Sequence, residues 1–103
     1  AGIGGAVAQN VGDLMRQLGA TQQVLAVTHL PQVAACADHH FVVTKMQSDG
    51  FAHSRVAEVS GNPRIAEIAR MISGQNESAV SLAHAREMLE RGQFTRRGRA
   101  VSA

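Results

Sequence analysis

The sequence predicts an α/β protein with a partial parallel sheet, an antiparallel hairpin at the edge of that sheet, and flanking helices. Three observations lead to this fold class. The run Val24 to Val27 is apolar throughout, which is typical of a strand covered on both faces. The pair Asp49-Gly50 separates two strand-like runs and predicts a tight hairpin. Apolar residues recur at helical spacing before and after these strands, so helices should flank the sheet.

The first half of the chain should contain a helix, a strand and a short helical segment. The helix should bury one apolar stripe, formed by Val7, Val11, Leu14, Met15 and Leu18. The buried strand Val24 to Val27 follows, and Pro31 should start a helical segment that reaches Ala37. Helix followed by buried strand is half of a βαβ unit, and the first strand of that unit is not in this sequence.

The second half should contain the hairpin and two helices. Val42 to Met46 should pair antiparallel with Phe51 to Val56. The next helix should be capped by Ser60 or Asn62 and end at Gly74, with a buried stripe of Ile65, Ile68, Ala69 and Ile72. The last helix should run from about Ser78 to Arg91, with Gly92 closing it.

Length and composition indicate one globular domain. The chain has 103 residues, of which 45% are hydrophobic, and this content is sufficient for a packed core. No apolar run approaches the roughly 18 residues of a membrane span, and no basic and apolar leader opens the sequence. Cys36 is the single cysteine, which excludes an internal disulfide. We therefore expect a soluble, cytoplasmic protein with no membrane partner.

The positive charge is concentrated at the carboxyl end. The formal net charge is +2, yet residues 1–90 carry six basic and eight acidic side chains. Residues 91–103 hold four arginines and no acid. We divide the chain into a folded unit, residues 1–91, and a basic flexible tail, residues 92–103. The tail either keeps the terminus solvated or contacts nucleic acid.

His29 is the first candidate for a functional side chain. It follows the predicted strand at the carboxyl edge of the sheet, where open α/β sheets handle their ligands. An imidazole held there can donate a hydrogen bond to a phosphate oxygen and stabilise developing charge. The alternative is a structural histidine with a satisfied hydrogen bond, which is the commoner role for a lone histidine.

A metal site near the second strand is the weaker hypothesis. Cys36, Asp38, His39 and His40 offer ligand chemistry, but the adjacent histidines should point to opposite faces of a strand. No paired Cys or His cluster completes a tetrahedral set. We therefore assign no metal ligands, and Cys36 is interpreted as a small buried residue.

Four segments carry a resemblance to a known family. GIGGAVA, VLAVTHLPQVAACADHHFVV, RIAEIARMISG and LAHAREML resemble the carboxyl-terminal end of the RecN family, bacterial DNA repair proteins of the SMC-like ATPase group. The resemblance covers roughly residues 1–91. It implies the carboxyl-terminal half of an ABC/SMC-type P-loop NTPase head, in which two heads sandwich ATP and a coiled coil separates the halves of each head. It also implies a nucleoid-associated role in double-strand break repair and recombination.

The resemblance implies roles for five residues. Gly2, Ile3, Gly4 and Gly5 match the D-loop, and His29 matches the switch histidine that approaches the γ-phosphate. The implied ligands are ATP and Mg²⁺ in the full-length protein, with none bound to the fragment. The implied partners are the missing amino-terminal half of the head, a second head in a homodimer, and DNA.

The sequence also departs from the family pattern. It has no GxxxxGK[ST] phosphate loop, no ABC signature and no acidic strand end to hold Mg²⁺. We expect a carboxyl-terminal fragment that serves ATP hydrolysis only within the full-length protein and is inactive alone. The alternative is a noncatalytic module that binds nucleic acid through its arginine tail or assembles with itself through unpaired strand edges.

Overall fold

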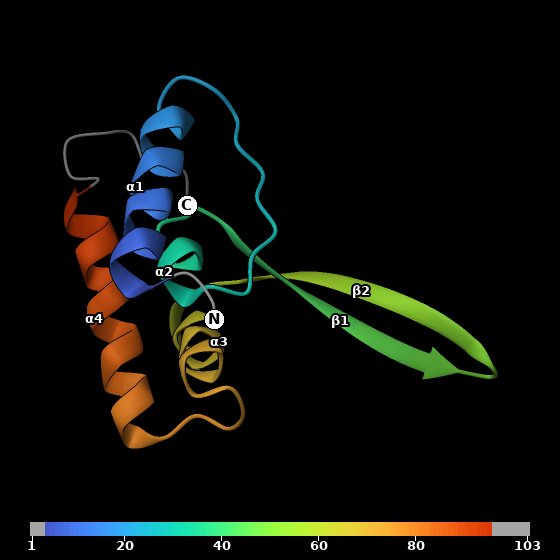
Figure 1. The fold of residues 1–103 in the computed structure, drawn as a ribbon. Coiled ribbons are helices and arrows are strands. Elements are labelled where there is room, and N and C mark those ends of the chain that lie inside the picture. The colour runs from blue at the N-terminus through green and yellow to red at the C-terminus, as the bar shows by residue number, and fades with distance from the viewer. Residues whose placement is uncertain (1–3, 96–103) are drawn as a thin grey trace.

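The computed structural model describes residues 4–95, which form four helices and one two-stranded sheet. The elements, in chain order, are α1 (Gly5–Gly19), α2 (Pro31–Ala34), β1 (His40–Ser48), β2 (Phe51–Val59), α3 (Gly61–Ser73) and α4 (Ala79–Thr95). The helices gather into one body, and the hairpin of β1 and β2 projects from it (Figure 1). The chain is accordingly elongated, with extents of 48, 32 and 30 Å.

The hairpin forms where the Asp-Gly pair predicts it. His40 pairs with Val59 at its base, and Ser48 pairs with Phe51 at its tip. Asp49 and Gly50 both have positive φ, 53° and 77°, in the two-residue turn. Two positive φ values give the turn a twist that matches the right-handed twist of the strands. The antiparallel pairing is confirmed, and both strands are longer than predicted.

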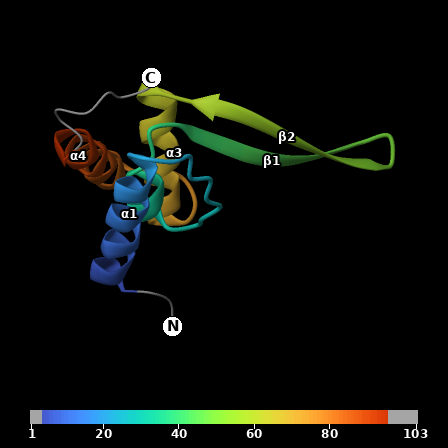
Figure 2. The same cartoon turned by 90° about the horizontal axis from the view of Figure 1, so that it is seen from above.

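The core lies where α3 packs against α4 and α2 contacts α3. The view from above shows α3 crossing α4 (Figure 2). Six buried residues form it: Ala34, Ala35, Ile68, Ala69, Ala85 and Met88. Four of the six are alanines, which let the helices approach closely but bury little apolar surface each. The stripe predicted for α3 is confirmed, because Ile68 and Ala69 are buried while Ile65 and Ile72 pack against the core.

The ends of the last two helices follow the sequence signals in part. α3 ends at Gly74, whose φ of 82° is left-handed and whose N–H donates to the Arg70 carbonyl at 2.8 Å. Ser78 caps α4, because its Oγ accepts from the Ser81 N–H at 3.1 Å. However, α4 continues to Thr95 and does not stop at Gly92. Gly92 is buried, and tertiary packing there overrides its low helix propensity.

The predicted strand Val24 to Val27 is not a strand in this structure. The segment has no regular secondary structure and joins no sheet within residues 4–95, and Leu25 and Val27 are 87% and 99% exposed. Within residues 4–95 the only sheet is the antiparallel pair of β1 and β2, so no parallel sheet is present there. The physical reason is that a strand needs partners for its backbone groups, and no strand within residues 4–95 pairs with this segment.

The apolar stripe predicted for α1 is also largely uncovered. Val7, Leu14 and Leu18 are about half exposed or more, at 53%, 64% and 49%. The residues that α1 buries are Ala8 and Gly12, on the face that packs against α2. The stripe therefore faces outward on the described part of the chain, because the parallel sheet that it was expected to cover is not formed.

Candidate functional site

His29 lies in a tight turn between the extended segment and α2. The Leu30 N–H donates to Thr28 Oγ1 at 2.9 Å, so the threonine side chain fixes the backbone on both sides of the histidine. The Leu30 carbonyl then accepts from the N–H groups of Val33 and Ala34, both at 3.1 Å, which starts α2. His29 itself is exposed. The turn thus holds the histidine backbone while the ring faces outward.

The structure brings one end of the predicted glycine segment close to α2. Gly2 and Ile3 lie outside the described residues. Gly4 is exposed and caps α1, and Gly5 is the first residue of the helix. A Cβ at Gly5 would stand 3.6 Å from Nε2 of Gln32, which follows His29 by three residues. The start of α1 and the helix after His29 are therefore neighbours.

Gly12 and Cys36 form the contact between α1 and α2. A Cβ at Gly12 would lie only 2.8 Å from the Cys36 Sγ and 3.1 Å from the Gln32 carbonyl oxygen. The glycine is needed here because the backbone of α1 lies directly against α2. The Cys36 thiol donates to the Gln32 carbonyl at 3.3 Å. As predicted, Cys36 is a small buried residue.

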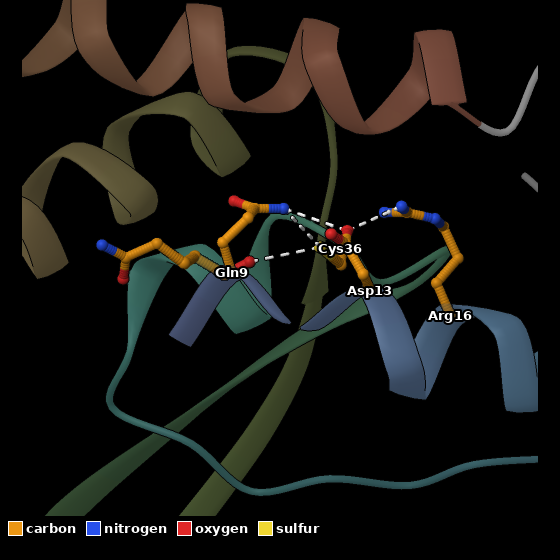
Figure 3. A network of polar contacts seen from close by, with 5 residues as sticks. Gln9, Asp13, Arg16 and Cys36 are labelled. Carbon is orange, nitrogen blue, oxygen red and sulfur yellow. Dashed lines mark hydrogen bonds and ion pairs between the residues drawn. The ribbon is translucent and has the colours of Figure 1, made fainter. Parts of the chain in front are cut away.

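A polar network closes over this contact (Figure 3). Gln9 Nε2 donates to the Cys36 sulfur at 3.8 Å and to Asp13 at 3.1 Å, and Asp13 also accepts from Arg16 at 2.7 Å. Burial raises the pKa of the Cys36 thiol, and the nearby charge of Arg16 only partly offsets this. The thiol is therefore protonated at neutral pH and serves packing, not nucleophilic chemistry.

Arg64 binds the carboxyl end of α2 and the turn that follows it. Its Nη2 donates to the carbonyl of Ala34 at 3.1 Å and to that of Ala37 at 2.8 Å. The arginine comes from the first turn of α3, about thirty residues further along the chain. Sequence reasoning missed this contact, because no local pattern marks an arginine that binds the carbonyls of a distant helix.

The residues of the metal hypothesis have separate roles in the structure. His39 Nδ1 lies 2.8 Å from the Glu58 carboxylate, and His40 is half-buried near Arg64. Burial lowers the pKa of His40 below its usual value of 6.5, the Arg64 charge lowers it further, and Glu67 opposes both effects. Among the described residues, no group of three or more His, Cys, Asp and Glu side chains is placed to share a metal ion.

Two of the clefts in the described surface lie near the elements discussed above. The larger, about 570 Å³, lies between one face of the hairpin and α3, with Val42, Met46, Ala57 and Ala66 among its lining residues. The smaller, about 120 Å³, lies between α1, α2 and α4 and includes Cys36. His29 lines neither of them. The histidine is therefore presented at the surface, outside both clefts.

Comparison with known proteins gives a consistent result. DNA repair protein RecN of Deinococcus radiodurans is 52% identical over 89 residues, or 86% of this chain. The RecN proteins of Treponema pallidum and Mycobacterium leprae are 43% and 48% identical over 94% and 86% of the chain. No protein-family model matches.

The matches confirm the resemblance to the RecN family that the four sequence segments predicted. The matched region is the carboxyl-terminal part of these relatives. This chain spans only about one sixth of their length, at 16%, 17% and 15% of the three proteins. The similarity therefore concerns one segment of a longer DNA repair protein.

Two further predictions concern membrane-spanning segments and the basic tail. None of the helices formed by residues 4–95 combines the length and apolar character needed to cross a bilayer. Arg91 lies in α4, 3.5 Å from the Glu87 carboxylate. The predicted tail begins inside α4, and Arg96, Arg97 and Arg99 lie outside the described residues.

Proposed function

We propose that this chain is the carboxyl-terminal part of the ATPase head of a RecN-type DNA repair protein. In the full-length protein it would supply His29 and the segment Gly2 to Gly5 to ATP hydrolysis between two heads, with Mg²⁺ and DNA as further ligands. The observation that carries the proposal is an outward-facing histidine on a hydrogen-bonded turn, in a sequence that matches RecN proteins over most of its length.

The chemistry of the turn supports this role. An imidazole N–H is a hydrogen-bond donor of the kind that stabilises charge on a transferring phosphoryl group. Such a donor must be held in place by its surroundings, and Thr28, Pro31 and α2 supply that support. The sequence contains no phosphate loop, so the residues that cradle the nucleotide come from elsewhere in the full-length protein.

The uncovered apolar surfaces support a missing half of the head. The run Val24 to Val27 and the outward stripe of α1 are adjacent in sequence and both exposed. In the proposed head, strands from the amino-terminal part pair with this run, so that it becomes a buried parallel strand covered by α1. Exposed apolar surface of this kind marks an interface in soluble proteins.

The decisive experiment is ATP turnover by the full-length protein that carries this segment. Replacing His29 by alanine should lower kcat about 100-fold and leave nucleotide binding nearly unchanged, because the lost donor acts on charge that develops during reaction. His84→Ala is the matched control, since His84 is an exposed histidine on α4, and it should retain full turnover. Normal turnover by the His29→Ala protein would refute the proposal.

The alternative function is nucleic-acid binding by the arginine tail. The observation that favours it is the concentration of four arginines without an acid in residues 91–103. Because α4 extends to Thr95, the deletion that tests it should remove residues 96–103 only. Loss of each phosphate contact should reduce the slope of log affinity against log salt by about 0.9 on duplex DNA. Unchanged DNA affinity and an unchanged slope would exclude a role of the tail in nucleic-acid binding.

A further inference from the structure

The helix that follows His29 cannot hold its own position. α2 has four residues, and isolated helices of this length are unstable in water. The last carbonyl of α2, that of Ala34, accepts one local bond from the Ala37 N–H at 3.2 Å, and a carbonyl oxygen can accept a second. The placement of α2, and of the turn before it, is therefore set by its neighbours.

Arg64 adds hydrogen bonds to this end of α2 from the side of α3. Its guanidinium donates to two carbonyls, those of Ala34 at 3.1 Å and Ala37 at 2.8 Å. The positive charge lies at the negative end of the α2 dipole, and hydrogen bonds from a charged donor are stronger than neutral ones. Arg64 is half-buried, which limits competition from water.

The other side of α2 rests against α1. The Gly12 backbone lies directly against Cys36 and Gln32, so α2 cannot move toward α1. These two contacts hold α2 from both sides, and its first residue, Pro31, follows His29 by only two residues. Leu30 belongs to both segments, because its N–H donates to Thr28 Oγ1 in the histidine turn and its carbonyl accepts the first bonds of α2. A shift of α2 would therefore displace His29.

We propose that Arg64 is a positioning residue for His29. It acts through α2, by fixing the carboxyl end of that helix, and does not itself contact the nucleotide. This inference rests on the proposed function, in which His29 acts on the phosphate. It assigns a catalytic consequence to an arginine that the sequence alone does not single out.

The first test is steady-state ATP hydrolysis by the full-length protein with Arg64→Gln, Arg64→Lys and Arg70→Gln. Arg64→Gln should lower kcat about 10- to 100-fold with little change in KM, since a small misplacement of a catalytic group has an effect of this size. Arg64→Lys keeps the charge and a donor, so it should restore part of the loss. Arg70→Gln alters an exposed arginine of the same helix that pairs with Glu67, and should leave kcat unchanged.

The second test separates positioning from general destabilisation. Arg64→Gln is combined with His29→Ala, and thermal unfolding of each protein is recorded. If Arg64 acts through His29, Arg64→Gln should lower kcat in the parent protein and have no further effect in the His29→Ala protein. A merely structural role would lower kcat by the same factor in both. Should the glutamine variant fail to fold, the same cycle with Arg64→Lys gives the comparison.

Each outcome bears on one of the two proposals. Unchanged kcat in Arg64→Gln, or an equal loss in both backgrounds, would overturn the positioning role and leave the role of His29 intact. Unchanged kcat in His29→Ala would instead refute the proposed function, whatever Arg64 does. Loss of kcat in Arg64→Gln, partial recovery in Arg64→Lys and no effect beside His29→Ala together would establish the inference.

Discussion

The helical body and the segment before α2 are both apolar in sequence but differ in their surroundings. Ile68 and Ala69 of α3 are fully buried between α4 and α2. Val27 is 99% exposed and Leu25 is 87% exposed, although they belong to a run of four consecutive apolar residues. The two regions thus have similar composition and opposite burial.

This difference shows what an apolar run can and cannot determine. A helix satisfies its own backbone hydrogen bonds, so α3 forms and then needs only a neighbour for its stripe. A strand needs a second strand for its backbone, and the described residues provide none beside Val24 to Val27. In our proposal this run becomes a strand only when the rest of the head supplies its partners. The helices and the hairpin form from the described residues alone.

Ile68→Ala should have the largest effect, because it tests whether the buried core of α3 and α4 stabilises the chain. Removing a fully buried side chain leaves a cavity and should lower the free energy of unfolding by about 2 to 5 kcal/mol. Urea unfolding of the chain, followed by far-UV circular dichroism, measures this loss. A loss below about 1 kcal/mol would mean that the α3–α4 core is not the stable part of the molecule.

Gly12→Ala tests the contact between α1 and α2. The added methyl group would meet the Cys36 sulfur at 2.8 Å and the Gln32 carbonyl at 3.1 Å, so α1 must move. We expect a loss of about 1 to 3 kcal/mol in the free energy of unfolding. Gly19→Ala is the control, because nothing lies within 4 Å of a Cβ there and alanine favours helix by up to about 1 kcal/mol. Equal effects of the two substitutions would argue against the close approach.

A fall in pH should lower the free energy of unfolding because of His40. The pKa of this histidine is lowered in the folded chain, chiefly by burial and then by Arg64, so the unfolded chain binds the proton more tightly. Its contribution to stability is complete above pH 6.5 and is lost as the pH falls from 6.5 towards the folded-state pKa. Urea unfolding across this window should show a smaller pH dependence for His40→Gln. An identical slope in the two proteins would contradict the assignment.

Val27→Ser should have the smallest effect. A fully exposed side chain loses no contact within the chain, so the free energy of unfolding should change by less than about 0.5 kcal/mol. The same substitution in the full-length protein should be strongly destabilising if the run becomes a buried strand there. Thermal unfolding of both proteins measures the contrast. An unchanged stability of the full-length protein would refute the prediction that this run is a buried strand there.

The parts of the fold that were predictable are those determined locally. The Asp49-Gly50 turn requires two positive φ values that these residues adopt readily, and it sets the register of the hairpin. Gly74 ends α3 for a similar reason, because its left-handed conformation costs a glycine little. The predicted end of α4 at Gly92 was wrong, because the burial of this glycine overrides its weak helix propensity.

The candidate site was predictable only in its sequence-adjacent parts. The position of His29 before a short helix started by Pro31 follows from a few consecutive residues, and the structure agrees. The supports of that helix come from Gly12 and Arg64, which are far away in sequence. Such contacts depend on how helices pack, and no periodicity or local motif encodes them. The proposed catalytic use of His29 and the glycines stays a prediction.

The hairpin turn also bears on the order in which the chain folds. The hydrogen bond from Arg64 to the Ala37 carbonyl joins residues 27 positions apart. A local hairpin closes in about 1 to 10 μs. Pairing of His40 with Val59 at the base of this hairpin then brings the residues before β1 close to those after β2. Closing the remaining short loop costs less chain entropy than closing the whole segment. A slow or misdirected turn at Asp49-Gly50 would therefore delay the docking of α2 on α3, far from the turn itself.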